Sequence, residues 1–164
     1  MKWVTAMSTP SPERIIVGVD DSPGGLAALR WAVHRARSRH CQLIAVRAWA
    51  LQLPRHGGRR IRDDRHRHVV VSFAGTVQRS EAGSVIQRSF QLTSGGIPAD
   101  VPIRIETPEG DPGTVLAGMA RRDSDLLVVG TRPGHPAWQA RHGSVSGYCA
   151  RHASCPVAVI PAPE

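Results

Sequence analysis

The residues best suited to chemistry lie near the C-terminus, where a strand, a loop and a helix are expected to follow one another. Gly130, Thr131 and Arg132 leave a buried apolar run, and Gly143 and Ser144 open a helical stretch. A helix N-terminus presents unpaired N–H groups and a partial positive charge, which suits phosphate. The Ser144 hydroxyl and the Arg132 charge would add to such a site. The spacing therefore indicates a phosphate-binding site, or else two turn glycines and a helix cap.

The other candidate residues stand where predicted strands end. In open parallel sheets, ligands bind beyond the carboxyl ends of the strands, at the point where the strand order reverses. Those ends carry Asp20, the stretch after Val46, Gly110 and Gly130. They are mostly small or acidic residues, and small residues let a ligand approach the backbone closely.

Catalytic machinery is not apparent in the sequence. The run Gly143-Ser144-Val145-Ser146-Gly147 has its serines at the wrong places for a nucleophile elbow. Asp20 and Asp21 are adjacent, so a strand end would point them in different directions rather than make an acid–base pair. Only Lys2 is a lysine, which leaves no Walker-type or Schiff-base lysine in the folded part. We therefore expect no catalytic residue.

A metal site or a disulfide framework is not expected either. The three cysteines are sparse and odd in number, and none forms a Cys-x-x-Cys pair. Cys41 and Cys149 are predicted to be small buried hydrophobes. His66 and His68 stand close together but have no fitting set of further ligands.

Length and composition indicate one globular domain. The chain has 164 residues, of which 41% are hydrophobic and only 4% aromatic, so the core must consist of aliphatic side chains. No apolar run is long enough to cross a membrane, and the start lacks the apolar middle of a secretory signal. We expect a cytoplasmic protein with a loose tail over residues 1–12 and a single domain over residues 13–162.

The net charge of +8 favours anionic partners. Much of it lies in the Arg- and His-rich segment 55–68. Because that segment has no interleaved aromatic residues and no known nucleic-acid motif, binding of nucleic acid is not expected. It contains no apolar period, so a long charged loop is predicted over about 51–70.

The order of apolar patterns predicts an α/β fold. Short β-branched runs predict strands at 14–20, 42–49, 101–106, 125–130 and 157–160. Helices are predicted from Pro23 to about His40, after Asp111, and after Ser144, with a poor helix at 73–92 because Gly75 and Gly83 interrupt it. Pro102 indicates that the third strand lies at a sheet edge. A strand, a helix and a strand in succession require parallel pairing with a right-handed crossover.

The two ends of this chain resemble the universal stress protein family. The first match is the run Ile15–Pro23 with Arg30-Trp31-Ala32 in the helix that follows. The second is the run Asp125–Arg132, then Gly143–Ser146, then Arg151–Ala153 and Cys155–Ile160. These blocks cover roughly half of the chain in the right order, whereas residues 51–108 carry little of the family's pattern.

The resemblance implies an open five-stranded parallel sheet with helices on both faces, of the adenine-nucleotide α-hydrolase type. It implies ATP as ligand, with magnesium as a possible companion, and a homodimer formed through the last strand. By the family pattern, Asp20 would meet the ribose and the backbone near Ala45–Ala48, with Ala45 and Val46 as its first residues, would hold the adenine. Gly130, Gly143, Ser144 and Val145 would hold the phosphates. Gly110, at a strand end, and Arg132, with its positive charge, complete the set of expected binding residues.

The phosphate motif departs from the family's at one position. Nucleotide-binding members carry Gly-x-x-Gly, nine residues, then Gly-Ser or Gly-Thr; here Pro133 replaces the second glycine and Gly134 follows one place late. Proline lacks a backbone N–H and fixes φ near −65°. Three functions therefore stay open: an ATP-binding stress-response domain, a homodimeric scaffold that binds no nucleotide, and a weak ATPase.

Overall fold

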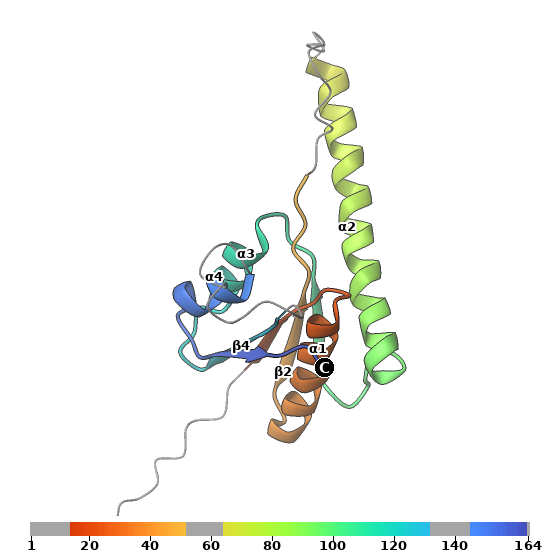
Figure 1. Cartoon of the computed structure of the whole chain (residues 1–164). Helices are drawn as coiled ribbons and strands as arrows, with labels where there is room; N and C mark the ends of the chain where they lie inside the picture. The colour runs from red at the N-terminus through yellow and green to blue at the C-terminus, as the bar shows by residue number, and fades with distance from the viewer. Residues whose placement is uncertain (1–13, 52–63, 132–144, 164) are drawn as a thin grey trace, which may run out of the picture.

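The computed structural model describes residues 14–51, 64–131 and 145–163. In these ranges a five-stranded, wholly parallel sheet has the order β3-β2-β1-β4-β5. Figure 1 shows the sheet with helices on both sides. The elements run in the order β1 (Arg14–Gly18), α1 (Pro23–Arg39), β2 (Gln42–Val46), α2 (Asp64–Ser94), β3 (Ile103–Glu106), α3 (Pro112–Met119), β4 (Asp125–Gly130), α4 (Val145–His152) and β5 (Val157–Ile160).

The predicted fold class and strands are confirmed, with shorter ends. The first strand stops at Gly18, although the Val19 N–H still bonds the Val46 carbonyl at 2.8 Å. The second stops at Val46, and the chain returns to the sheet only at Trp49, which forms an isolated bridge with Glu109. β3 is an edge strand, as Pro102 indicated, and begins after that proline.

Alternating side chains of the inner strands fill two cores. Ile15 and Val17 of β1 face α1 and the buried part of α2, whereas Ile16 between them packs against α3 and α4. The strands β1, β2 and β4 are thus covered on both faces, which accounts for their continuous apolar sequence. Cys41 and Cys149 are buried, one in each core, as predicted.

Local capping explains where two helices begin. Ser22 accepts a hydrogen bond from the Gly25 N–H at 3.1 Å, with Pro23 at the first helical position of α1. Asp111 accepts one from the Thr114 N–H at 3.0 Å, with Pro112 in the same place in α3. Both caps leave extended backbone before the helix and satisfy donors that the helix itself cannot.

Helix α2 is the main correction to the sequence prediction. It runs for 31 residues from Asp64, so residues 64–70, expected to belong to a charged loop, are helical; residues 52–63 of that predicted loop lie outside the described residues. Ala82, Ile86 and Phe90 follow one another at four-residue spacing in the C-terminal half of α2 and are all buried, and Ile86 and Phe90 belong to the core shared with the sheet and α1. Gly83 does not interrupt the helix, and nothing lies within 4 Å of the Cβ it lacks, so no close contact requires a glycine there. The N-terminal part of α2 extends beyond the rest of the described structure (Figure 1).

Within the described ranges, no helix combines the length and the apolar composition that crossing a membrane requires.

Candidate functional site

The carboxyl ends of β1 and β4 lie side by side at the point where the strand order reverses. β1 and β4 are neighbours in the sheet, but the chain leaves β1 toward α1 on one face, and α4, which follows β4 in sequence, packs on the other. Asp20 follows β1, and Thr131 follows β4. This is the place where open parallel sheets bind ligands.

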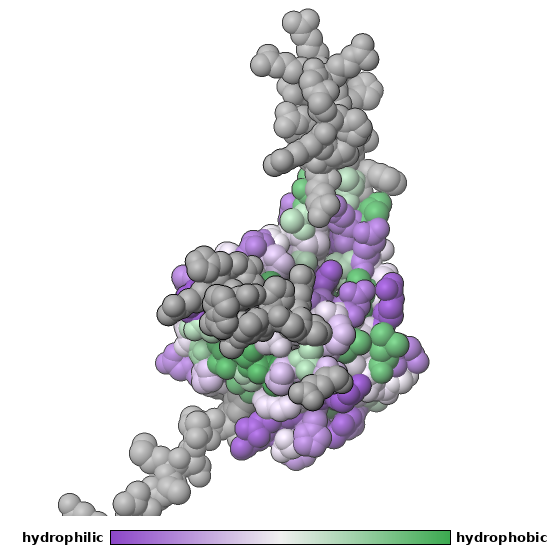
Figure 2. All heavy atoms as spheres, viewed as in Figure 1, coloured by the Kyte–Doolittle hydropathy of each residue, from purple (hydrophilic) through white to green (hydrophobic). Residues whose placement is uncertain are grey.

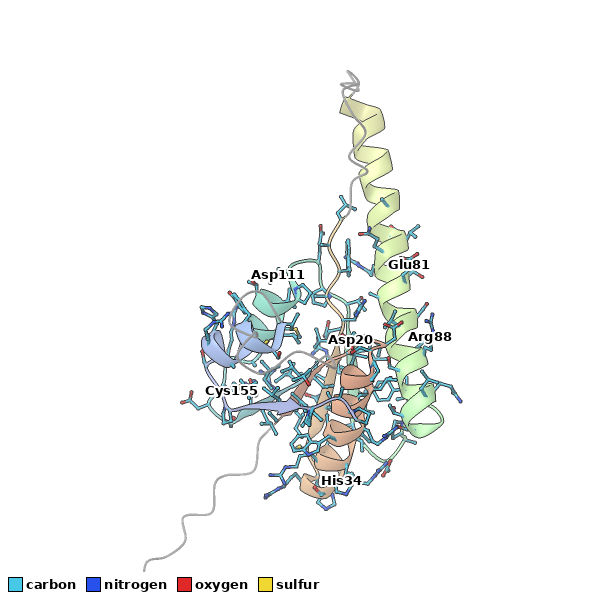
Figure 3. The ribbon with its side chains drawn as sticks, in the orientation of Figure 1. Asp20, His34, Glu81, Arg88, Asp111 and Cys155 are labelled. Atoms are coloured by element: carbon cyan, nitrogen blue, oxygen red, sulfur yellow. The ribbon has the colours of Figure 1, made fainter. Side chains whose placement is uncertain are left out.

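Asp20 is held in a fixed position by the turn that follows it. Its Oδ1 accepts hydrogen bonds from the Ser22 hydroxyl at 2.5 Å and the Ser22 N–H at 3.2 Å. Ser22 in turn caps α1. A partly exposed carboxylate oriented in this way can accept further hydrogen bonds, for example from the hydroxyls of a sugar. Figure 3 shows Asp20 near the middle of the molecule, between Asp111 of the α3 side and Arg88 of α2.

Asp21 belongs to different surroundings. It is exposed and forms an ion pair with Arg88 of α2, with 3.8 Å between the charged atoms. The two adjacent carboxylates thus have separate partners, as expected from their position at a strand end, and do not form an acid–base pair.

Gly130 touches the backbone of the first turn of α1. A Cβ placed on Gly130 would lie 2.3 Å from both the carbonyl carbon and the oxygen of Gly24, and one on Gly24 would lie 1.8 Å from the Thr131 carbonyl oxygen. Only glycine permits this approach of two backbones. The close packing alone therefore requires Gly130, whatever its relation to a phosphate.

Gly24 and Gly25 are site residues that sequence reasoning missed. A Cβ on Gly25 would stand 1.8 Å from Oδ1 of Asp20, so this glycine makes room for the carboxylate. The available signal was the pair itself, because two consecutive glycines in a helix cost free energy that only a close contact justifies.

The residues predicted to hold an adenine are largely committed to the sheet. Ala45 and Val46 have side chains 0% and 1% exposed, and the Val46 carbonyl already accepts the Val19 N–H. The next residue is tied as well, because the Arg47 N–H donates to the Glu106 carbonyl at 3.0 Å. Ala48 is the first partly exposed small residue beyond this strand end.

Gly110 has a conformational reason to be glycine. Its φ is 144°, which L side chains rarely adopt, and its N–H donates to the Trp49 carbonyl at 2.8 Å. It thereby joins the end of β2 to the turn before α3 and places Asp111 as the cap of that helix. The Thr114 N–H and hydroxyl bonded to this carboxylate hold the pKa of Asp111 below its usual value.

Trp49 is a third residue that sequence reasoning did not single out. Its indole N–H donates to the Thr107 carbonyl at 2.8 Å, and the Arg79 guanidinium lies 5.8 Å from the centre of the ring. Gly75 faces the far edge of the same ring, where a Cβ would stand 3.5 Å away. Trp49 therefore connects the carboxyl edge of the sheet to helix α2.

The predicted phosphate loop is described only at its ends. Arg132, Gly143 and Ser144 lie outside the described residues, as does Pro133. Val145 is the first residue of α4 and is 37% exposed. That helix is placed against α3 by Gly113, on which a Cβ would lie 2.9 Å from the Tyr148 ring.

Comparison with known proteins identifies the family. The sequence model of the Universal stress protein family matches residues 12–161, so the chain belongs to this family, as its two ends predicted. Among curated proteins it is 32% identical to Universal stress protein Rv2623 of Mycobacterium tuberculosis over 157 residues, which cover 89% of this chain and 46% of that protein. It is 36% identical to Universal stress protein Slr1101 of Synechocystis over 66 residues, covering 40% of this chain and 61% of that one. The chain thus spans about half the length of the mycobacterial relatives that it matches.

Solved structures have the same fold. The universal stress protein UspA from Lactobacillus plantarum superposes with a TM-score of 0.65 at 22% identity, covering 92% of this chain and 98% of that one. A universal stress protein in complex with cAMP gives a TM-score of 0.57 at 19% identity, covering 93% and 99%. These likenesses concern the arrangement of the sheet and helices.

Proposed function

We propose that this chain is a nucleotide-binding domain of a stress-response or signalling protein, with ATP or another adenine nucleotide at the carboxyl edge of the sheet. The observation that carries the proposal is the arrangement at the carboxyl ends of β1 and β4, where the strand order reverses. There Ser22 orients the carboxylate of Asp20, and glycines let the neighbouring backbone segments approach closely. A relative of the same fold was solved with cAMP, which supports a purine nucleotide.

In this proposal the described residues have distinct tasks. Asp20 would accept hydrogen bonds from the ribose, and Ala48, two residues beyond the end of β2, would border the base. Phosphate would lie toward the N-terminus of α4, where Val145 begins the helix and Gly143, Ser144 and Arg132 precede it. Gly110 and Gly130 would shape the site through the backbone contacts that they permit.

Magnesium would arrive with the nucleotide. In the described part of the chain, no three His, Cys, Asp or Glu side chains come together as a metal site. Asp20 is engaged with Ser22, so the phosphates and water would supply most ligands of the ion. Weak ATP hydrolysis would need no more than this, but no described side chain is assigned to it.

We also propose a homodimer joined through β5. The two sheet edges differ: β3 carries the ion pair Arg104–Glu106, whereas β5 reads Val-Ala-Val-Ile, with Val159 43% exposed. Charges protect an edge strand against pairing, and an apolar bare edge invites it. A scaffold that dimerises without nucleotide remains the second candidate, and a cytoplasmic location stays a prediction.

The deciding experiment is a binding measurement on the purified chain. Isothermal titration calorimetry with ATP, AMP and cAMP, with and without magnesium, is expected to give a dissociation constant in the micromolar range for at least one of them. Mild denaturation of the purified chain, followed by chromatography of the released small molecules, would reveal any nucleotide that co-purifies. No heat of binding at millimolar nucleotide would overturn the nucleotide proposal and leave the scaffold.

A further inference from the structure

One flank of helix α1 carries an exposed aromatic residue. Trp31 is 37% exposed in the middle of this helix, whereas its neighbours on the buried stripe are close to fully covered. Large aromatic side chains are uncommon on free surfaces and enriched at protein interfaces. The position of Trp31 around the helix decides which surface it extends.

The orientation of α1 follows from an ion pair on its other flank. Arg37 bonds Asp100, which lies in the turn between α2 and β3, so that flank faces the β3 side of the molecule. Six residues turn a helix by about 600°, which places Trp31 about 120° from Arg37, on the opposite side of the buried stripe. Since α1 contacts both β4 and β5, the Trp31 flank faces the β5 edge.

Arg35 lies one turn further along the same flank. It is half-buried, and its Nε is shielded from solvent without a hydrogen-bond partner among the described residues. Tryptophan and arginine are the residue types that most often dominate the energy of an interface. The exposed ring of Trp31 and the accessible part of Arg35 together make this flank a candidate contact surface for another molecule.

The adjoining strand β5 indicates which kind of surface the other molecule must have. On the α1 side, Ala158 and Ile160 of β5 are only partly buried, and β5 pairs with β4 alone in the described structure. A strand edge is completed by another strand, and a second copy of β5 related by a twofold axis presents the same apolar residues to this one. Figure 2 shows apolar residues just below the grey ones, at the place where Figure 1 draws β5.

We infer that the interface with a second copy of this chain extends from β5 onto α1, with Trp31 as its aromatic anchor and Arg35 beside it. This inference rests on the proposed homodimer and adds the helix to it. Each copy contributes the same flank, so one substitution changes the interface twice.

The test is the dimer dissociation constant, measured by sedimentation equilibrium on the full chain. Trp31→Glu is expected to weaken the dimer about tenfold or more, and Arg35→Met to weaken it to a smaller extent, with circular dichroism and melting temperature of the monomer unchanged. Trp31→Phe should keep most of the affinity. The matched control is Val77→Glu, because Val77 is 40% exposed on α2, away from this edge. Val159→Glu in the strand itself should abolish the dimer.

The outcomes separate the two ideas. A wild-type chain that is monomeric at tens of micromolar would remove the homodimer and this inference with it. If the wild type is dimeric and Val159→Glu monomeric while Trp31→Glu binds as tightly as Val77→Glu, the strand interface stands and its extension onto α1 is wrong. A dimer that survives both Val159→Glu and Trp31→Glu lies elsewhere, which overturns both.

Discussion

The guanidinium of Arg14 holds the carboxylate of Asp125 through two hydrogen bonds of 2.7 Å, at the paired beginnings of β1 and β4. The same guanidinium donates to the Met119 carbonyl, and the Arg122 N–H donates to Asp125 at 3.1 Å. The Asp125 side chain is fully buried, whereas that of Arg14 is 23% exposed. This pair fastens the two central strands at the end opposite the candidate site.

Removing either partner should destabilise the protein, but unequally. Arg14→Met leaves a buried carboxylate with one backbone donor, and we expect a loss of about 3–5 kcal/mol in the free energy of unfolding. Asp125→Asn leaves the Arg14 guanidinium without its partner, but this group can still reach water. The loss in the free energy of unfolding should therefore be smaller, about 2 kcal/mol. Asp100→Asn is the control, because its pair with Arg37 is exposed and should contribute less than about 1 kcal/mol. Urea denaturation of the three variants measures the difference, and equal losses for all would contradict it.

The same pair predicts how stability depends on pH. Burial raises the pKa of Asp125, but the bonds from Arg14 and Arg122 outweigh it, and the pKa lies below its usual value. A carboxyl group whose pKa is lowered by folding contributes its full stabilisation when the pH is above its pKa in the unfolded chain, about 3.9. This stabilisation is lost as the pH falls through the pKa of the folded protein. Denaturation between pH 7 and 2 should therefore show a loss below about pH 4 that is reduced in Asp125→Asn. An unchanged acid limb in that variant would refute this assignment.

Gly130→Ala should destabilise the fold even without ligand. The new Cβ would meet the Gly24 backbone at 2.3 Å, and neither backbone can move freely, so we expect a cost of about 3 kcal/mol. Gly83→Ala is the matched control: it lies inside α2 with open space around it and should stabilise by about 0.5–1 kcal/mol. Thermal and urea unfolding measure both. If Gly130→Ala were as stable as the wild type but bound no nucleotide, the glycine would serve the ligand rather than the packing.

Trp49→Ala should loosen the N-terminal half of α2. The indole joins Thr107 to Gly75 and Arg79, so it links this half of the helix to the carboxyl edge of the sheet. Hydrogen exchange over residues 64–80 should become faster, while residues 82–90, which are anchored by Ile86 and Phe90, should keep their protection. Arg104→Ala on β3 serves as the control. Unchanged exchange at 64–80 would mean that Trp49 does not anchor the helix.

His40→Gly should stabilise the protein. His40 follows α1 with φ 51° and ψ 42°, the left-handed conformation in which glycine is favoured. Relief of this strain is expected to add about 1 kcal/mol to the free energy of unfolding. His34→Gly, at an exposed position inside the same helix, should instead cost about 1 kcal/mol. Denaturant midpoints that move in the same direction for both variants would disprove the argument.

Pro133 tests the phosphate loop itself. Ser144→Ala should weaken nucleotide binding by about 1.5–3 kcal/mol, the value of one hydrogen bond to a charged group. Pro133→Gly should restore a backbone donor and tighten binding, although the added freedom of the loop offsets part of the gain. Calorimetry with ATP and magnesium compares the variants with the wild type. Equal affinity for wild type and Pro133→Gly would show that the proline costs the site nothing.

Local chemistry made much of the fold predictable. Runs such as Ile15–Val17 indicate buried strands because β-branched residues pack well there, and Ser22-Pro23 and Asp111-Pro112 mark helix starts by satisfying free N–H groups. The sequence predicts only a short, poor helix in the region of α2 because the buried stripe of this helix is narrow. Ala82, Ile86 and Phe90 anchor it, but most of their neighbours are polar. Three apolar residues give only a weak helical period, so the sequence alone does not show that this stripe packs against the sheet.

The sequence by itself determined the strands, the helices other than α2, the caps of α1 and α3 and the family, because these depend on residues close together in the chain. Only the tertiary structure decided that Arg14 meets Asp125, that Gly24 touches Gly130, and that Trp31 lies on the β5 flank of α1. Such contacts depend on which strands become neighbours, and an apolar run specifies burial without specifying a partner. The strands covered on both faces occupy the centre, and the partly exposed β3 and β5 take the edges, since that order removes the most apolar surface from water.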